Sequence, residues 1–180
     1  MPQRILQRAA GGALLSGLLL VLRGRHDDGD GAVPLNTISH WVWPDSAFHA
    51  RGLSVRHTAT GALIHFGASC FWSVIFEGRR LLRPARAPEP SVREVLRDAL
   101  ALSAAAAWVD LALVPPALSP GFERRLSGSS LCRVYLAFAA GLALGELWPA
   151  AARPQRPARR LSGPHPSAPA APLLDEQRAA

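Results

Sequence analysis

Residues 57–80 read HTATGALIHFGASCFWSVIFEGRR and combine an apolar core, Ala59 to Phe76, with charged groups at both ends. As a helix, the stretch from His57 to Gly78 would span about 33 Å at about 1.5 Å per residue, which matches the hydrocarbon thickness of a bilayer. The charged groups at its ends can reach water by snorkelling along the helix. This stretch therefore predicts a transmembrane helix over about residues 57–78.

One face of this predicted helix repeats a small or polar residue at every fourth position. The repeat consists of His57, Gly61, His65, Ser69, Ser73 and Glu77. Small residues at this spacing let membrane helices approach closely, so we expect Gly61, Ser69 and Ser73 to be packing positions. His65 has two interpretations: a hydrogen bond to a neighbouring helix, or a proton-relay or ligand site, because ionisable groups at membrane depth are costly and often functional.

Three further apolar segments predict membrane helices at about residues 5–22, 92–114 and 130–147. The first follows Arg4 and Arg8 and is similar to the start of a signal peptide. No small-residue cleavage site follows it, so we interpret it as a retained span with Arg8 snorkelling to the interface.

The later spans carry recognisable boundary and packing motifs. Ser91 and Glu94 form an S-x-x-E capping box that predicts the start of the third span, and Ser129 or Ser130 is the predicted cap of the fourth. The fourth span also contains a GxxxG motif. Its two glycines, Gly141 and Gly145, are predicted packing positions.

The connecting segments complete the predicted architecture. Residues 34–48 predict a short helix lying in the membrane interface, with Asn36 as its N-cap and Trp41 and Trp43 at the interface. Residues 151–180 are rich in Pro, Ala, Arg and Ser and are expected to be disordered. The prediction is an all-α fold: a four-helix transmembrane bundle over residues 1–150 with a short interfacial helix, followed by a disordered C-terminal tail.

Arginine supplies all of the chain's lysine and arginine charge, and the distribution of the arginines along the chain predicts a topology. The chain has 20 basic residues, none of them lysine, and a net charge of +7. The arginines flank apolar segments instead of forming patches interleaved with aromatic residues, so we exclude nucleic acid as a partner. Thirteen arginines fall on the side that holds the two termini and seven on the other. The positive-inside rule therefore predicts that both termini are cytoplasmic in a bacterial inner membrane.

Asp110 and Arg133 lie near the ends of the third and fourth spans that a short loop joins. We expect them to pair, because an unpaired carboxylate there is costly. The alternative is that Asp110 faces His57 or His65 and titrates. Glu77 and Glu146, at the opposite ends of their helices, are expected to form surface ion pairs with nearby arginines.

The sequence carries no motif for a metal, a cofactor or a catalytic centre. The aspartates of residues 24–32 lack the spacing and closing Glu of a calcium loop. His57 and His65 would lie about 12 Å apart along one helix, too far to share a zinc ion. HExxH, GxSxG and phosphate-binding glycine motifs are absent from the sequence.

Three segments carry a resemblance to a known group of proteins: PLNTISHW (34–41), RHTATGALIHFGASCFWSVIFE (56–77) and PGFERRLS (120–127). They resemble small uncharacterised inner-membrane proteins of proteobacteria, over about residues 34–147. The resemblance implies four membrane helices and an inner-membrane location, and no activity. The chain departs from that pattern at Ala62 and Phe66, where the related segments have His or Tyr.

Two functional hypotheses follow. The first is a non-enzymatic accessory or packing component whose partners are the lipid bilayer and, through the small-residue faces, a second copy or another membrane protein. The second is a small transporter or proton-linked membrane protein that uses His65 and Asp110.

Overall fold

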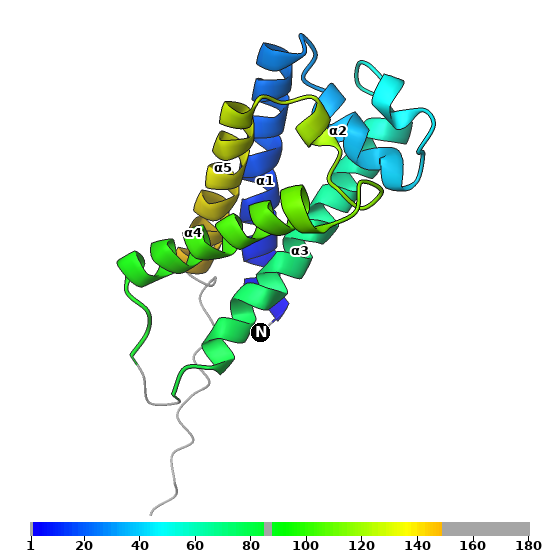
Figure 1. Ribbon diagram of the computed structural model, residues 1–180. Helices are drawn as coiled ribbons and strands as arrows, with labels where there is room; N and C mark the ends of the chain where they lie inside the picture. The colour runs from blue at the N-terminus through cyan, green and yellow to red at the C-terminus, as the bar shows by residue number, and fades with distance from the viewer. Residues whose placement is uncertain (1, 85–87, 149–180) are drawn as a thin grey trace, which may run out of the picture. The chain divides into compact units, whose positions relative to one another are not determined.

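The computed structural model describes residues 2–84 and 88–148, which are largely helical and include no strand (Figure 1). The α-helices of this part are α1 (Pro2–Asp27), α2 (Val33–Ile38), α3 (Thr60–Leu81), α4 (Val92–Trp108) and α5 (Gly128–Leu147). Short 3-10 turns cover Ser39–Trp41, Ala47–His49 and Phe122–Arg124. Two π-helical turns, Val55–Ala59 before α3 and Val109–Leu113 after α4, extend those helices. The all-α prediction is confirmed, whereas the tail predicted to be disordered lies outside the described residues.

Three helices in the described part of the chain are long and apolar enough to cross a membrane: Pro2–Asp27, Val55–Arg79 and Gly128–Leu147. They contain the predicted spans at 5–22, 57–78 and 130–147. Large apolar side chains on these helices stay exposed, among them Leu14, Leu63 and Phe71. An apolar surface of this kind is compatible with a membrane protein.

The helix boundaries agree with the sequence patterns in some places and differ in others. Ser91 and Glu94 form the reciprocal capping box at the start of α4. Ser127, not Ser129 or Ser130, caps α5, since its hydroxyl accepts from the Ser130 N–H.

The prediction that Asn36 caps the short helix is wrong, because this helix begins at Val33, before the proline that fixes its first turn. Asn36 is instead buried inside α2. Its side-chain amide donates to Ala50 O at 3.1 Å and Gly52 O at 3.0 Å. This residue therefore ties the segment before α3 to α2.

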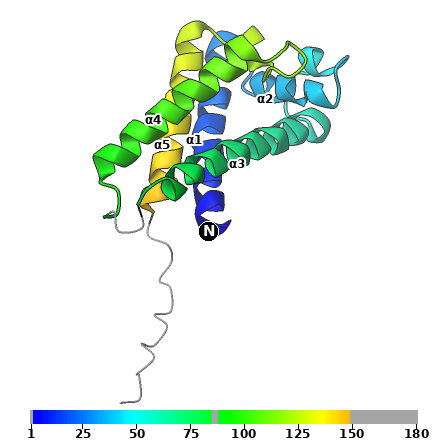
Figure 2. The same cartoon turned by 60° about the horizontal axis from the view of Figure 1, so that its bottom comes forward.

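Glycines allow α1 and α5 to lie side by side (Figures 1 and 2). A Cβ atom on Gly141 would lie 2.2 Å from the Gly11 carbonyl oxygen, and one on Gly145 would lie 2.6 Å from the Arg8 Cα. Any larger residue at either position would separate the two backbones. The GxxxG motif of α5 is thus occupied by another helix of the same chain.

The small residues of α3 also face neighbours within the chain. Gly61 packs on α2, where an added Cβ would lie 1.8 Å from the Leu35 carbonyl oxygen. Ser69 and Ser73 are buried. One apolar cluster joins α3, α4 and α5 around Phe76 and Leu142, and a second joins α1, α2 and α5 around Leu20.

The close contact of α1 and α5 predicts that Gly141→Ala lowers stability by about 1–3 kcal/mol, because the methyl group must displace backbone atoms of α1. The measurement is the midpoint of unfolding in dodecyl sulfate, followed by circular dichroism. Gly128→Ala is the matched control on the same helix, since nothing lies within 4 Å of its added Cβ. Equal midpoints for the two variants would contradict the contact.

Candidate functional site

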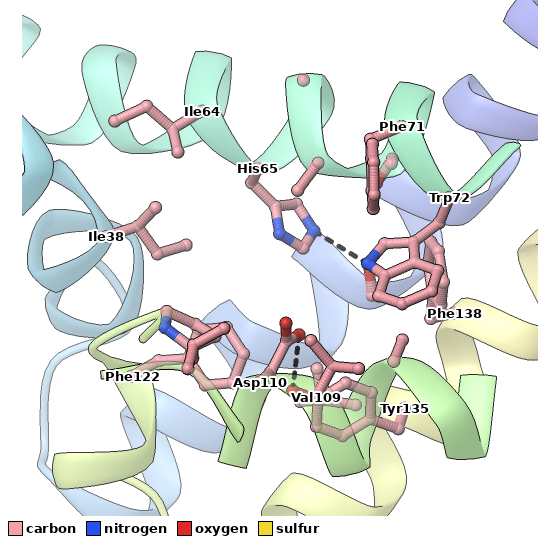
Figure 3. Close-up of a pocket in the computed structure, with 18 of the residues that line it drawn as sticks. Ile38, Ile64, His65, Phe71, Trp72, Val109, Asp110, Phe122, Tyr135 and Phe138 are labelled. Carbon is pink, nitrogen blue, oxygen red and sulfur yellow. Dashed lines mark hydrogen bonds between the residues drawn. The ribbon is translucent and has the colours of Figure 1, made fainter. Parts of the chain in front are cut away.

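A cavity of about 620 Å³ lies beside α3, between that helix and the end of α4 with its π-helical turn (Figure 3). Its walls are mainly apolar and rich in aromatic rings. The aromatic residues are Trp41, Phe71, Trp72, Phe122, Tyr135 and Phe138. The polar groups of the lining are the side chains of Ser16, His65, Ser69 and Asp110, the Tyr135 hydroxyl, and the indole N–H groups of Trp41 and Trp72. Cavities of this size and character bind small, mostly apolar molecules.

His65 enters the cavity from α3 and is held by a hydrogen bond to α1. The Ser16 hydroxyl donates to the Gly12 carbonyl oxygen at 2.6 Å, and its oxygen lies 2.8 Å from His65 Nε2. Because that hydroxyl has only one proton to donate, Nε2 of His65 must be the donor to Ser16. In a neutral ring, Nδ1 then carries the lone pair and is an acceptor.

Asp110 enters the cavity from the opposite side, on the π-helical turn that follows α4. The Tyr135 hydroxyl of α5 donates to Asp110 Oδ2 at 3.0 Å, which fixes the orientation of the carboxylate. Figure 3 shows the His65 ring and the Asp110 carboxylate pointing toward one another across the cavity. No hydrogen bond or ion pair joins these two described side chains, and both line the open space of the cavity.

The predicted pair of Asp110 and Arg133 is wrong. The Arg133 guanidinium is exposed and donates to the carbonyl oxygen and hydroxyl of Ser129, on its own helix, at 3.4 and 3.2 Å. Arg133 and Tyr135 are two residues apart, about 200° around the helix, so they face opposite sides. With Tyr135 turned toward Asp110, Arg133 points away from it.

Sequence reasoning missed Tyr135, although one signal was available. Tyr135 is the single tyrosine of the chain and lies within an apolar span. A phenol in such a segment needs a hydrogen-bond partner when it is buried. Asp110 is the acidic group nearest in sequence on the neighbouring span, which makes it the natural candidate.

His57 does not line this cavity, so the alternative in which His57 faces Asp110 is wrong. Its Nδ1 is 3.0 Å from the Ser39 hydroxyl oxygen, in the segment packed on the start of α3. The described residues include no group of three or more His, Cys, Asp or Glu side chains placed to hold a metal ion.

Glu77, the fourth candidate from the sequence, belongs to a separate buried ion cluster. The Arg8 guanidinium contacts the carboxylates of both Glu77 and Glu146, and so joins α1 to α3 and α5. The Arg8 side chain is 0% exposed. Its guanidinium carbon also lies 5.3 Å from the Phe76 ring centroid, within the range of a cation–π contact.

This cluster corrects two expectations. Arg8 does not snorkel, and Glu77 and Glu146 are not surface groups but buried carboxylates that contact Arg8. The reason is the close approach of α1 and α5 at Gly145, which places Arg8 inside the bundle, where the two carboxylates compensate its charge.

Comparisons with known proteins add no assignment to these sites: no protein-family model, curated protein or solved structure matches the chain.

The buried cluster predicts that Arg8→Gln destabilises the protein by about 3–5 kcal/mol, because it removes the buried guanidinium that contacts both the Glu77 and Glu146 carboxylates. The measurement is again the unfolding midpoint in dodecyl sulfate. Arg25→Gln is the control, since Arg25 is exposed on the same helix, and we expect a change within about 0.5 kcal/mol.

A triple variant separates lost charge balance from lost packing. Arg8→Leu combined with Glu77→Gln and Glu146→Gln removes every charge of the cluster and should restore much of the loss. A single Arg8→Gln variant as stable as Arg25→Gln would show that the cluster does not hold the helices together.

Proposed function

We propose that the chain is a four-span protein of a bacterial inner membrane with both termini in the cytoplasm. Support comes from the three long apolar helices, the exposed apolar side chains and the unequal distribution of arginine. The fourth crossing would be α4 with its π-helical turn. Residues 92–113 would span about 30 Å, enough for the hydrocarbon core.

In this arrangement α2 and the turn after it form the interfacial segment. Trp41 is 49% exposed and Val42 is 50% exposed at this end of the bundle. Amphipathic aromatic side chains are typical of the boundary between hydrocarbon and headgroups.

Labelling of single cysteines tests the topology. In a Cys70→Ser, Cys132→Ser background, Leu53→Cys should react in intact spheroplasts with a maleimide that cannot cross membranes. Arg93→Cys should react only after lysis, because it lies at the cytoplasmic end. Both positions are exposed. The reverse pattern, or equal labelling of both, would contradict the proposed orientation.

We further propose that the cavity beside α3 binds a lipophilic amine, an apolar molecule that carries one ammonium group. The observation that carries this proposal is the composition of the lining. Asp110 is the acidic residue among aromatic walls, and the described residues of the lining include no arginine. A cation is the ligand charge that such a site favours, because it compensates the carboxylate and contacts the faces of aromatic rings.

The hydrogen-bonding groups of the cavity fit an ammonium head. Tyr135 occupies Oδ2 of Asp110, which leaves Oδ1 as an acceptor. Ser16 occupies Nε2 of His65, which leaves Nδ1 as a second acceptor. An ammonium group offers N–H donors to both acceptors, whereas a carboxylate ligand would be repelled by the negative charge of Asp110.

The proposed role is binding without chemistry, which keeps the non-enzymatic expectation. The faces of Gly61, Gly141 and Gly145 contact other helices of the same chain, so the proposal does not use them for self-association. The cavity, in contrast, is open space lined from several helices.

Matched ligands and variants test the binding proposal. In nanodiscs, dodecylamine should quench the tryptophan fluorescence of the cavity more strongly than dodecanol or dodecanoate, and Asp110→Asn should weaken dodecylamine binding by about tenfold or more. Dodecanol binding should be unchanged in Asp110→Asn, because the uncharged alcohol forms no ion pair with Asp110 in the wild type.

Filling the cavity supplies the steric control. Ala68→Trp places an indole in the lining and should abolish binding of all three probes, whereas Ala62→Trp, exposed on the same helix outside the lining, should not. Equal affinity of dodecylamine for the wild type and Asp110→Asn would overturn the role of the carboxylate.

A small proton-linked transporter using His65 and Asp110 is the second candidate, favoured by the placement of both side chains in one cavity. A transporter differs from a binding protein because it moves the amine across the membrane. In proteoliposomes with an imposed proton gradient, a transporter would accumulate the amine through the wild type and not through His65→Ala at equal protein abundance. Binding without accumulation would favour the binding protein.

A further inference from the structure

A second, shallower space lies between α3 and the middle of α4, near the α3 end that carries Arg79. This groove has a volume of about 760 Å³ and mostly apolar walls. The apolar residues of its walls are Ile75, Phe76, Leu82, Ala101, Leu102 and Ala105. Ala101 and Ala105 are exposed and one turn apart, so their small side chains leave a trough along α4.

Arg79 and Asp98 line the polar end of the groove, and Arg97 lies beside it in contact with Asp98, so positive charge exceeds negative charge among these three groups. Arg79 pairs with Asp98 Oδ2, while Arg97 donates to Asp98 Oδ1 through Nε at 3.0 Å and lies 2.9 Å from it through Nη2. Two guanidinium groups therefore share one carboxylate. The Arg97 side chain is 72% exposed, so its remaining N–H groups face outward and can bind an anion.

Arg79 has a fixed position at the wall of the groove. Its guanidinium carbon lies 3.9 Å from the Phe76 ring centroid, and Asp98 holds the group from the α4 side. The positive charge is thus placed where the apolar trough ends. An apolar trough that ends at basic residues matches a molecule with a hydrocarbon chain and an anionic head.

We propose that this groove binds an anionic phospholipid, with one acyl chain along Ala101 and Ala105 and the phosphate on Arg97 and Arg79. The inference rests on the membrane insertion proposed above, in which this end of α3 and α4 faces the cytoplasmic leaflet. Basic sites between membrane helices on that side are suited to anionic headgroups. The site is separate from the amine cavity and does not use Asp110.

Native mass spectrometry tests the proposal with two lipids of identical acyl chains. The full-length protein, extracted from vesicles of equal phosphatidylglycerol and phosphatidylcholine, should retain phosphatidylglycerol preferentially. Arg97→Gln should reduce that preference by about fivefold. The variant keeps the pair of Arg79 and Asp98, so the fold should be unaffected. Arg133→Gln, the same charge change at the opposite end of the bundle, is the control and should keep the preference.

Two further variants distinguish this groove from a general attraction to anionic lipid. Ala101→Trp fills the trough and should reduce retention of phosphatidylglycerol, whereas Ala104→Trp, exposed on α4 outside the lining, should not. Equal retention of the two lipids by the wild type, or an unchanged preference in Arg97→Gln, would overturn the proposal. Either result would leave the proposed topology intact, because cysteine labelling measures that independently.

Discussion

The buried guanidinium of Arg8 is the interaction on which the arrangement of the long helices depends. It enters from α1 and meets one carboxylate from α3 and one from α5. A cation and two anions inside an apolar bundle are costly to bury, and the cost is tolerable only when all of them remain together. The three helices therefore have little freedom to slide or rotate relative to one another without separating the charges.

Glycine makes this charge cluster possible. Because Gly141 and Gly145 lack side chains, the backbone of α5 lies against α1, and Arg8 is enclosed instead of exposed to lipid or water. Packing and electrostatics thus act at the same place. The glycines bring the backbones of α1 and α5 together, and the ion cluster fixes how the two helices are shifted along each other. The cluster does not include α4, and α4 makes few contacts with α3.

The spaces beside α3 and α4 follow from that arrangement. Where α4 packs on α5, the apolar cluster around Phe76 and Leu142 is continuous. Between α3 and α4, one cavity faces the π-helical turn with Asp110, and one groove faces the arginines near Asp98. The π-helical turn supports a functional role for the cavity, since such turns reposition side chains and are frequent at functional sites. The two sites differ in charge, and so the ligands proposed for them differ in charge.

The sequence by itself determined where the long helices lie and some of their boundaries, because apolar periodicity, capping residues and prolines act over a few neighbouring residues. It correctly indicated the all-α class, the capping box at Ser91 and the apolar segments within α1, α3 and α5. Only the tertiary structure decided which polar groups meet. Arg8 contacts carboxylates 69 and 138 residues away, and Asp110 accepts from Tyr135 and not from Arg133. Each residue turns a helix by about 100°, so a partner depends on how far the neighbouring helix is rotated and shifted, which packing across the whole bundle sets.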